Sequence, residues 1–331
     1  MTSISAPTRP AGIDSPCEVR HLSKRYGTHT VVDDLTFTIP RNQVVGLIGP
    51  NGAGKTTTMK MLLGLVRPTG GDISLLGRTV GEPRWGDALH RVGSMIEAPP
   101  IYDRLTARQN LEYQGLAVSG TVDHEEVDTL LRLVDLADRA DDRPRGYSLG
   151  MRQRLGIAIT LVGRPELVIL DEPGNGLDPA GIIEIRKLMG RLPEAGTTVL
   201  VSSHQLAEVQ QACNQLIILA NGRTVAQGTT TEILSGRSRH VFHVTVDDSE
   251  VPLAANALRS AGLSMFDRVG PMFVIEPPIE TDGRDLNHLL ASAGVYASAI
   301  SRPVVSLEEA FLDLVQQPPT ELRPSEEATA S

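Results

Sequence analysis

The feature that most constrains this chain is the stretch GLIGPNGAGKTTTMKMLLGL, which begins at Gly46. It fits the pattern G-x-x-x-x-G-K-[ST] through Gly49, Gly54, Lys55 and Thr56. The apolar run QVVGLIG ends where the glycines begin, and apolar residues at helical spacing follow Thr56. The segment therefore predicts a buried strand, a glycine-rich loop and a helix in that order, which is the context that such a loop requires.

A loop of this kind is suited to binding phosphate. Glycines let the backbone curl so that successive N–H groups point inward, and the N-terminus of the following helix adds about half a positive charge. Lys55 can then reach β- and γ-phosphate oxygens, and the Thr56 hydroxyl can ligate Mg²⁺. The alternative is a glycine-rich turn that only caps a helix. The expected nucleotide-binding residues of the loop are Asn51, Gly52, Ala53, Gly54, Lys55, Thr56 and Thr57.

The loop alone does not distinguish GTPases, kinases, helicases and transport ATPases from one another. A second site, which is acidic, is needed to choose among these functions. The buried run LVILDEP ends in Asp171 and Glu172. At the carboxyl edge of a parallel sheet both side chains can face a nucleotide crevice. Asp171 suits an Mg²⁺ contact, direct or through water, and Glu172 suits a general base for an attacking water. The alternative is a pair of exposed acids at a strand end.

The order of the predicted elements indicates an α/β fold with a mostly parallel sheet. LVILD and TTVLVSS are buried strands, and a helical pattern follows each of them. Near Gly236 the composition shifts to short strands alternating with helices, which predicts a small α/β appendage. We expect a disordered tail at 1–16, a nucleotide-binding domain at 17–236, an accessory domain at 237–316 and a disordered tail at 317–331.

Composition limits the partners. The formal net charge of −9 and the pI near 5.4 argue against a broad nucleic-acid footprint, which needs a basic face. No run approaches the roughly 18 apolar residues that span a bilayer, and the N-terminus has no apolar h-region. The two cysteines, Cys17 and Cys213, lie far apart without metal-ligand spacing. We therefore expect a chain that is neither secreted nor membrane-spanning, in a reducing compartment.

The motifs GPNGAGKTT, YSLGMRQRL, LVILDEP, NGLDP and VLVSSH follow one another in this order. In this order they resemble the nucleotide-binding domain of ABC (ATP-binding cassette) transporters, over roughly residues 17–235. The resemblance implies a P-loop NTPase fold of the ABC type, with a mixed sheet and a helical subdomain at about 100–160, followed by the small C-terminal α/β domain. It also implies ATP hydrolysis with Mg²⁺, by a homodimer or a dimer with a second ABC ATPase subunit.

The segment YSLGM takes the place of the family's signature loop, which completes the ATP site of the partner subunit. By this resemblance Ser148 would offer its hydroxyl, and Gly150 its N–H, to the γ-phosphate bound across the dimer. Tyr147, Leu149 and Met151 depart from the usual Leu-Ser-Gly-Gly-Gln. The alternative is an ordinary helix start with Ser148 as its N-cap.

Three more residues match positions with known roles in the family. His204 matches the switch histidine that contacts the γ-phosphate and helps to hold the attacking water. Asp178 matches the loop that connects the two sites, and Tyr26 matches the aromatic residue that stacks on adenine, a contact worth about 1 kcal/mol. The alternative for His204 and Tyr26 is a structural role at a strand end.

Glu97 stands where most family members have a glutamine that links the metal site to the membrane partner. A glutamate keeps an oxygen ligand but adds a negative charge beside Mg²⁺. This substitution, YSLGMRQRLGIA and the C-terminal domain together resemble bacterial exporter ATPases of the bacitracin and lantibiotic self-protection type. The resemblance implies a separate transmembrane permease, docked near Ala98 to Arg104, and a cytoplasmic location at the inner face of the membrane.

Two other function classes compete with this interpretation. One is a soluble ABC ATPase that acts on chromosomes, DNA repair or ribosomes, but such proteins usually carry coiled-coil insertions, zinc modules or tandem cassettes. The other is a nucleotide-dependent regulatory module that does not turn over. The presence of Lys55, Asp171, Glu172 and His204 weighs against the second class, whereas Glu97 and the altered signature favour it.

Overall fold

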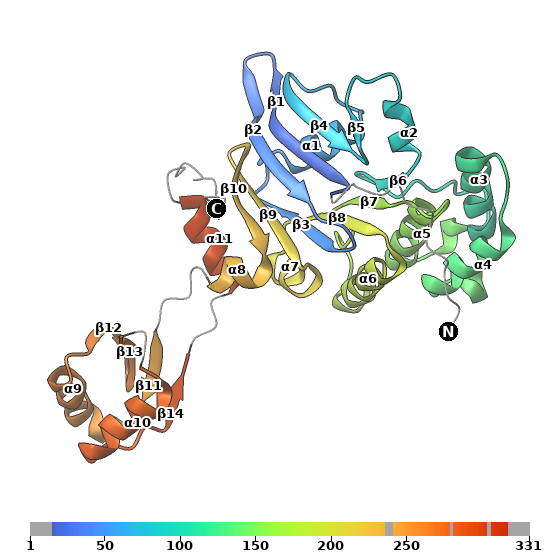
Figure 1. Ribbon diagram of the computed structural model, residues 1–331. Helices are drawn as coiled ribbons and strands as arrows, with labels where there is room; N and C mark the ends of the chain where they lie inside the picture. Colours follow the sequence, from blue (N-terminus) through green and yellow to red (C-terminus); the bar gives the residue numbers. More distant parts are fainter. Residues whose placement is uncertain (1–14, 236–240, 279–280, 303–305, 317–331) are drawn as a thin grey trace, which may run out of the picture. The chain divides into compact units, whose positions relative to one another are not determined.

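The computed structural model describes residues 15–235, 241–278, 281–302 and 306–316. The chain divides into two compact units, one formed by Met1–Thr230 with Phe311–Ser331 and the other by Thr231–Ala310 (Figure 1). The expected tails at 1–16 and 317–331 lie outside the described residues, except for Ser15 and Pro16.

A six-stranded sheet forms the centre of the larger unit. Its strands are β3 (Val44–Ile48), β6 (Val92–Met95), β7 (Leu167–Asp171), β8 (Thr198–Ser203), β9 (Gln215–Ala220) and β10 (Arg223–Thr229). Their spatial order is β10-β9-β3-β8-β7-β6, and only β10 at the edge is antiparallel to its neighbour. Every residue of β3, β7 and β8 is buried. Such continuous apolar runs are typical of strands that are covered on both faces.

Helices follow the strands whose ends carry the predicted site residues. Helix α1 (Lys55–Leu62) follows β3, α6 (Pro179–Arg191) follows β7, and α7 (Leu206–Ala212) follows β8. Helix α1 contacts both β7 and the antiparallel sheet described next. The carboxyl ends of β3, β7 and β8 therefore meet at one edge of the sheet, beside the N-terminus of α1.

The antiparallel sheet of the larger unit has the order β2-β1-β4-β5, formed by β1 (Cys17–Tyr26), β2 (His29–Ile39), β4 (Gly70–Leu75) and β5 (Arg78–Thr79). The sequence pattern predicts only short β segments here, but β1 and β2 are 10 and 11 residues long. The pairing of these strands shifts register in three places. Each bulge reverses the in–out alternation, so a long strand has the pattern of several short ones.

Three helices pack on one another at one end of the larger unit (green in Figure 1), and they cover the expected helical subdomain. They are α3 (Ala107–Ser119), α4 (His124–Leu133) and α5 (Leu149–Leu161). The apolar spacing of the segment VDTLLRLVDLAD predicts a helix that continues to Asp138, but α4 ends at Leu133. Asp135 has a φ of +53°, which stops the helix, and a 3₁₀ turn follows at Ala137–Arg139. A further 3₁₀ turn, Pro144–Gly146, leads to Ser148.

The remaining short elements are α2 (Trp85–Leu89) and a 3₁₀ turn at Pro193–Ala195, both in the larger unit, and α8 (Thr230–Ser235), of which only Thr230 belongs to the larger unit. Cys17 and Cys213 are buried free thiols. Burial raises the pKa of each to about 12, with a further contribution from Glu18 at Cys17. Both are therefore small core residues in this fold.

The smaller unit contains an antiparallel sheet with the order β12-β13-β11-β14. Its elements follow the order β-α-β-β-α-β, an arrangement shared by ferredoxin-like folds. They are β11 (Phe242–Thr245), α9 (Val251–Ser260), β12 (Ser264–Val269), β13 (Met272–Glu276), α10 (Gly283–Ser292) and β14 (Ala299–Ser301), with a 3₁₀ turn at Asp248–Glu250. Helix α11 (Leu307–Gln316) follows the last strand and belongs to the smaller unit only as far as Ala310. The sequence pattern predicts these strands except β12.

Candidate functional site

The glycine-rich loop between β3 and α1 lies directly against neighbouring backbone. A Cβ atom on Gly49 would lie 2.5 Å from the carbonyl oxygen of Leu219, and one on Gly54 would lie 2.9 Å from that of Val31. Gly54 also has a φ of +95°. Larger side chains are excluded at both positions, so the two glycines of the sequence pattern are required by the packing of the loop.

Lys55, the first residue of α1, folds back over the loop. Its Nζ donates to the carbonyl oxygen of Gly49 at 2.8 Å and to that of Pro50 at 3.4 Å. Burial lowers the pKa of this ammonium, and the nearby carboxylates of Glu172 and Asp171 oppose that shift. A positive charge held inside a loop of backbone N–H groups is well placed to contact phosphate oxygens.

A chain of hydrogen bonds connects the loop helix to the ends of β7 and β8. The Thr56 hydroxyl donates to Asp171 Oδ2 at 2.9 Å, and the Ser202 hydroxyl donates to Asp171 Oδ1 at 2.5 Å. The same Ser202 oxygen accepts the backbone N–H of Glu172 at 2.9 Å. Asp171, 8% exposed, is thus held on both oxygens. The structure therefore brings three predicted site residues, Thr56, Asp171 and Glu172, into one connected cluster.

His204 completes this cluster from the end of β8. Its Nδ1 lies 2.5 Å from Glu172 Oε2, and both side chains remain partly open to solvent. Glu172 has a φ of +50°, an uncommon conformation for a residue with a side chain. Strained backbone at the point where a carboxylate meets a histidine is typical of functional sites. The geometry fits a base that is oriented by a neighbouring imidazole.

The predicted metal ligands are only partly brought together. Thr56 and Asp171 present a hydroxyl and a carboxylate oxygen in direct contact, and Mg²⁺ prefers such hard oxygen ligands, with substrate phosphates as further ligands. These two residues fit the ion. Glu97 does not join them, because its Oε1 lies 2.6 Å from Lys60 Nζ. The hydrogen bond to Glu97 raises the pKa of Lys60.

Tyr26, the predicted adenine-stacking residue, lies at the end of β1 with about half of its surface exposed. Lys24 Nζ lies 4.8 Å from the centroid of its ring, a cation–π contact. The exposed ring leaves surface for a planar ligand, and its role in binding adenine stays a prediction.

The residues expected to act across a dimer lie apart from this cluster. Ser148 caps α5 by accepting the Met151 N–H at 3.2 Å, and Asp178 caps α6 by accepting the Gly181 N–H at 3.0 Å. Both are exposed. In the described part of the chain, no hydrogen bond joins Ser148, Gly150 or Asp178 to the glycine-rich loop. Their proposed contact with a nucleotide held by another subunit stays a prediction.

Two residues of this region were missed by the sequence interpretation. Ser202 holds Asp171 and the backbone of Glu172, and Lys60 holds Glu97. A hydroxyl at the end of a strand adjacent to the acidic strand was the available signal for Ser202. Lys60 follows Thr56 by four residues, so that helical spacing places it on the same side of α1.

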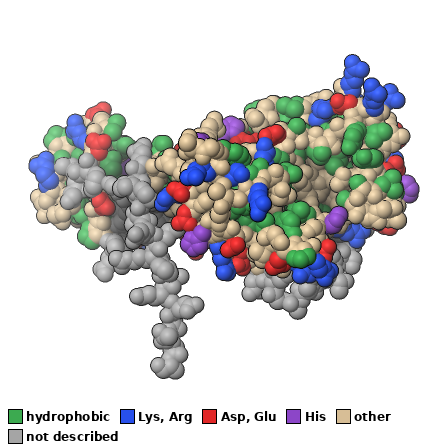
Figure 2. Space-filling model, turned by 90° about the horizontal axis from the view of Figure 1, so that it is seen from above, with side chains coloured by type: hydrophobic (Ala, Val, Ile, Leu, Met, Phe, Trp, Pro, Cys, Tyr) green, Lys and Arg blue, Asp and Glu red, His purple; other side chains and the backbone are tan. Residues whose placement is uncertain are grey.

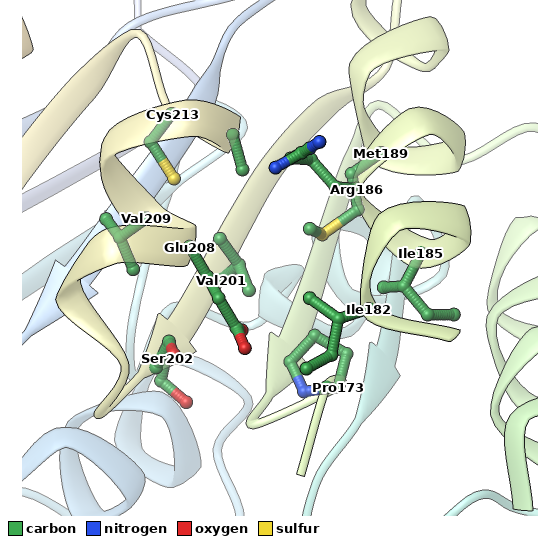
Figure 3. Close-up of a pocket in the computed structure, with 13 residues that line it drawn as sticks. Pro173, Ile182, Ile185, Arg186, Met189, Val201, Ser202, Glu208, Val209 and Cys213 are labelled. Atoms are coloured by element: carbon green, nitrogen blue, oxygen red, sulfur yellow. The ribbon is translucent and has the colours of Figure 1, made fainter. Parts of the chain in front are cut away.

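A small cavity lies behind the cluster, between α6, α7 and the end of β8 (Figure 3). Its volume is about 30 Å³, roughly the space of two water molecules and far too small for a nucleotide. Glu208 lies over it, and burial raises the pKa of this carboxyl. Among the described residues, none forms a hydrogen bond with Glu208 Oε1.

Charged side chains of both signs are mixed on the surface of the larger unit. Figure 2 shows Lys and Arg side chains interspersed with Asp and Glu on the visible face of the larger unit. Among the described residues, no helix has both the length and the apolar character needed to cross a bilayer.

Comparison with known proteins gives consistent matches. Residues 32–175 match the family described as ABC transporter. The chain is 35% identical to the bacitracin transport ATP-binding protein BcrA of Bacillus licheniformis over 298 residues, which cover 89% of this chain and 95% of that protein. It is 41% identical to the lantibiotic transport ATP-binding protein SrtF of Streptococcus pyogenes, over 63% of this chain and 89% of that protein.

A solved structure described as the ATP-binding subunit of an ABC transporter has the same fold. Its TM-score to this chain is 0.60 at 34% identity, and the match covers 67% of this chain and 93% of that structure. The shared fold is the P-loop ABC-type nucleotide-binding domain that the motifs predict. The BcrA alignment is longer than the larger unit, so that it also includes part of the smaller one.

Proposed function

Since the chain belongs to the ABC transporter family, as an ATP-binding subunit that hydrolyses ATP, we propose that it powers the export of an antibiotic or peptide through a separate transmembrane permease. The names of BcrA and SrtF, which describe bacitracin and lantibiotic transport, support this substrate class. Residues 15–235, which include all of the predicted site, contain no helix that could span a bilayer. The transport path is assigned to a partner in this proposal because BcrA and SrtF are named as ATP-binding proteins of transport systems.

The observation that carries this proposal is the hydrogen-bond chain from Thr56 through Asp171 and Ser202 to Glu172, with His204 beside it. It joins the glycine-rich loop to the acids of β7 and the histidine of β8. If Asp171 and Glu172 served only the fold, they would not need two hydroxyl groups and a histidine in contact with them. Hydrolysis of a phosphoanhydride bond depends on positioned groups of these kinds.

In the proposed mechanism, Lys55 contacts the β- and γ-phosphates, and Thr56 and Asp171 would hold Mg²⁺. The ion, when bound, would neutralise charge on the phosphate oxygens. As the water oxygen bonds to the γ-phosphorus and the bond from this phosphorus to the leaving ADP breaks, Glu172 accepts a proton from the water. His204 holds the Glu172 carboxylate in position through its 2.5 Å contact. Tyr26 stacks on adenine.

We propose that two such subunits form a dimer in which each completes the site of the other. Ser148 and Gly150 lie at the exposed start of α5, and Asp178 lies at the exposed start of α6. In this position they can face a second chain. Binding of ATP closes the dimer, and hydrolysis reopens it.

The permease is proposed to dock on the segment from Ala98 to Arg104. Tyr102 in this segment is about half exposed and packs edge-on against Tyr113, with ring centroids 4.9 Å apart. Exposed aromatic side chains are enriched in protein interfaces. This contact would attach the subunit to the cytoplasmic face of the membrane.

The test is ATP-dependent dimerisation of Glu172→Gln, measured by light scattering with Mg²⁺, beside the turnover of the unaltered protein. Loss of the base is expected to slow hydrolysis about 10²- to 10⁴-fold and to spare binding. The variant should therefore accumulate as a dimer only with ATP. Glu194→Gln, a change at an exposed glutamate after α6, is the control and should hydrolyse ATP normally. Normal turnover of Glu172→Gln would contradict the role of Glu172.

The competing function is a regulatory module that binds nucleotide without turnover. The altered signature at Leu149 and the glutamate at position 97 favour it. A Glu172→Gln protein that binds ATP tightly but stays monomeric, together with no hydrolysis by the unaltered chain, would support this second function instead.

A further inference from the structure

Glu97 occupies a strained turn directly after strand β6. The Ala98 N–H donates to the carbonyl oxygen of Ile96 at 2.8 Å, which closes a three-residue turn around Glu97. Glu97 itself has a φ of +67°. Three-residue turns with a positive φ at the central residue are rare and strained, so that other contacts must hold them.

The side chain of Glu97 has one such contact. Its Oε1 lies 2.6 Å from Lys60 Nζ, although about two thirds of the Glu97 side chain is exposed. Lys60 projects from α1, whose first turn also carries Thr56. Because these two residues are four apart, they share one side of the helix. Thr56 contacts Asp171, and Lys60 contacts Glu97, so that one side of α1 holds both acidic groups.

We propose that Lys60 is a positioning residue that holds the Glu97 carboxylate in this strained turn and competes with the Thr56–Asp171 metal site for it. The inference rests on the proposed function, because it assumes that Thr56 and Asp171 hold the metal of a bound nucleotide. It also assumes that Glu97, once released from Lys60, can reach the metal held by Thr56 and Asp171; in the structure its carboxylate contacts Lys60. If the Glu97 carboxylate were released from Lys60, the turn that leads into the segment from Ala98 to Arg104 would also lose this contact.

A simpler effect of Lys60 has to be separated from this one. A positive charge near a cation site weakens cation binding through its field alone, whichever residue stands at position 97. If Lys60 acts through Glu97, removing the Lys60 charge changes the affinity for the cation only while Glu97 carries a charge. A double-mutant cycle distinguishes the two cases.

The first experiment measures Mn²⁺ affinity by electron paramagnetic resonance, with the protein saturated by the non-hydrolysable analogue AMP-PNP. Lys60→Met removes the charge but keeps an apolar stem, and we expect it to tighten Mn²⁺ binding roughly fivefold, as for the loss of one exposed ion pair. In the Glu97→Gln background the same change should have no effect. Lys187→Met, at an exposed lysine on α6, is the matched control and should leave affinity unchanged. Equal tightening by Lys60→Met in both backgrounds would overturn the proposal in favour of a field effect.

The second experiment uses no nucleotide and no metal. Hydrogen exchange of a peptide that covers residues 96–101 reports the Ala98 N–H that closes the turn. We expect Lys60→Met and Glu97→Gln each to speed exchange several-fold, and the double variant to be no faster than either one. Unchanged exchange in both single variants would show that Lys60 does not hold the turn. If the unaltered protein failed to bind Mn²⁺ with AMP-PNP, the proposed function would fail, and this experiment would still decide the role of Lys60.

Discussion

At the scale of single residues, Ser202 has an unusual position because one hydroxyl serves both acids of the site. It donates to Asp171 Oδ1 and accepts the Glu172 N–H, and it is fully buried. The bond to the backbone supports Glu172 in its left-handed conformation, with a φ of +50°. Ser202 therefore orients two groups whose distance and direction decide the rate of a reaction.

We predict that Ser202→Ala lowers the ATP turnover number about tenfold, which corresponds to about 1.4 kcal/mol in activation free energy. The smaller side chain fits the space but leaves the Glu172 N–H and one Asp171 oxygen without their partner. Steady-state ATPase measurements test this. Ser203→Ala is the matched control, since the Ser203 hydroxyl accepts the Gln205 N–H and, in the described part of the chain, forms no hydrogen bond with Asp171 or Glu172. Equal turnover in the two variants would contradict the role of Ser202.

Sequence patterns predicted those site residues that follow buried strands or fit a spaced motif, such as Lys55, Asp171 and Glu172. Ser202 and the partner of Glu97 could not be predicted in this way. Ser202 is 31 residues from Asp171, and Lys60 is 37 residues from Glu97. Such contacts depend on which strands become neighbours and on how a loop turns, and neither is encoded in local spacing.

At the scale of elements, the contact between β6 and α5 depends on glycine. A Cβ atom on Gly93 of β6 would lie 1.9 Å from the carbonyl oxygen of Thr160 in α5. On the helix side, a Cβ atom on Gly156 would lie 2.8 Å from Pro99 Cβ and 2.9 Å from Met95 Sδ. Helix α5, which is capped by Ser148, therefore packs directly against β6, the strand that precedes Glu97.

We predict that Gly93→Ala lowers the free energy of unfolding by about 3 kcal/mol, because the new methyl group must displace backbone. Gly190→Ala in α6 provides the control. A Cβ atom there meets nothing within 4 Å, and alanine favours a helix, so we expect about 0.5 kcal/mol of stabilisation. Urea unfolding followed by circular dichroism measures both. A Gly93→Ala protein as stable as the unaltered chain would show that α5 can shift at little cost.

A second contact between elements lies at the amino ends of β6, β7 and β8, opposite to the edge of the sheet that carries the candidate site. The Glu166 side chain, 8% exposed, accepts hydrogen bonds from Arg91 Nε at 2.7 Å and Arg41 Nη1 at 3.0 Å. Its backbone also bonds to Arg91 and Thr198. Burial alone would raise the pKa of Glu166, but the hydrogen bonds and charges of both arginines outweigh it, and the pKa lies below its ordinary value of 4.5.

We predict that Glu166→Gln costs about 1.5 to 3 kcal/mol of unfolding free energy at pH 7. Because the folded-state pKa is lowered, the ionised group stabilises the fold above pH 4.5, and this contribution is lost as the pH falls through the lowered pKa. The difference between the two proteins should therefore shrink on acidification. Urea titrations from pH 7 downward measure it, and a difference that is independent of pH would contradict the assignment.

Element boundaries were less predictable than element types. The period-2 pattern failed along β1 because register shifts interrupt it, and the helical pattern after Val127 continued past Leu133 because Leu136 is buried although it lies outside α4. In β1 the backbone stays a strand while the pattern breaks, whereas after α4 the apolar pattern continues although the helix has ended. The strands LVILD and TTVLVSS were predictable because burial and strand geometry coincide there.

At the scale of the whole molecule, the two units have separate hydrophobic cores. The core of the larger unit includes Leu22, Leu47, Met59 and Leu200, and that of the smaller unit surrounds Phe273. The site residues named above, from Tyr26 to His204, all belong to the larger unit. A ligand that binds only one unit stabilises that unit by mass action and leaves the other unchanged.

We predict that AMP-PNP with Mg²⁺ raises the unfolding temperature of the larger unit alone. At a hundredfold excess over the dissociation constant the stabilisation is about 2.7 kcal/mol, which corresponds to a shift of roughly 5 to 10 °C for a unit of this size. Trp85, the single tryptophan, packs against the core of the larger unit, so that its fluorescence reports this unit specifically. Far-ultraviolet circular dichroism reports both units. With nucleotide, the fluorescence transition should move upward while one component of the circular dichroism transition stays in place. A single transition that moves as a whole by both probes would show instead that the two cores unfold together, and that the smaller unit takes part in the response to nucleotide.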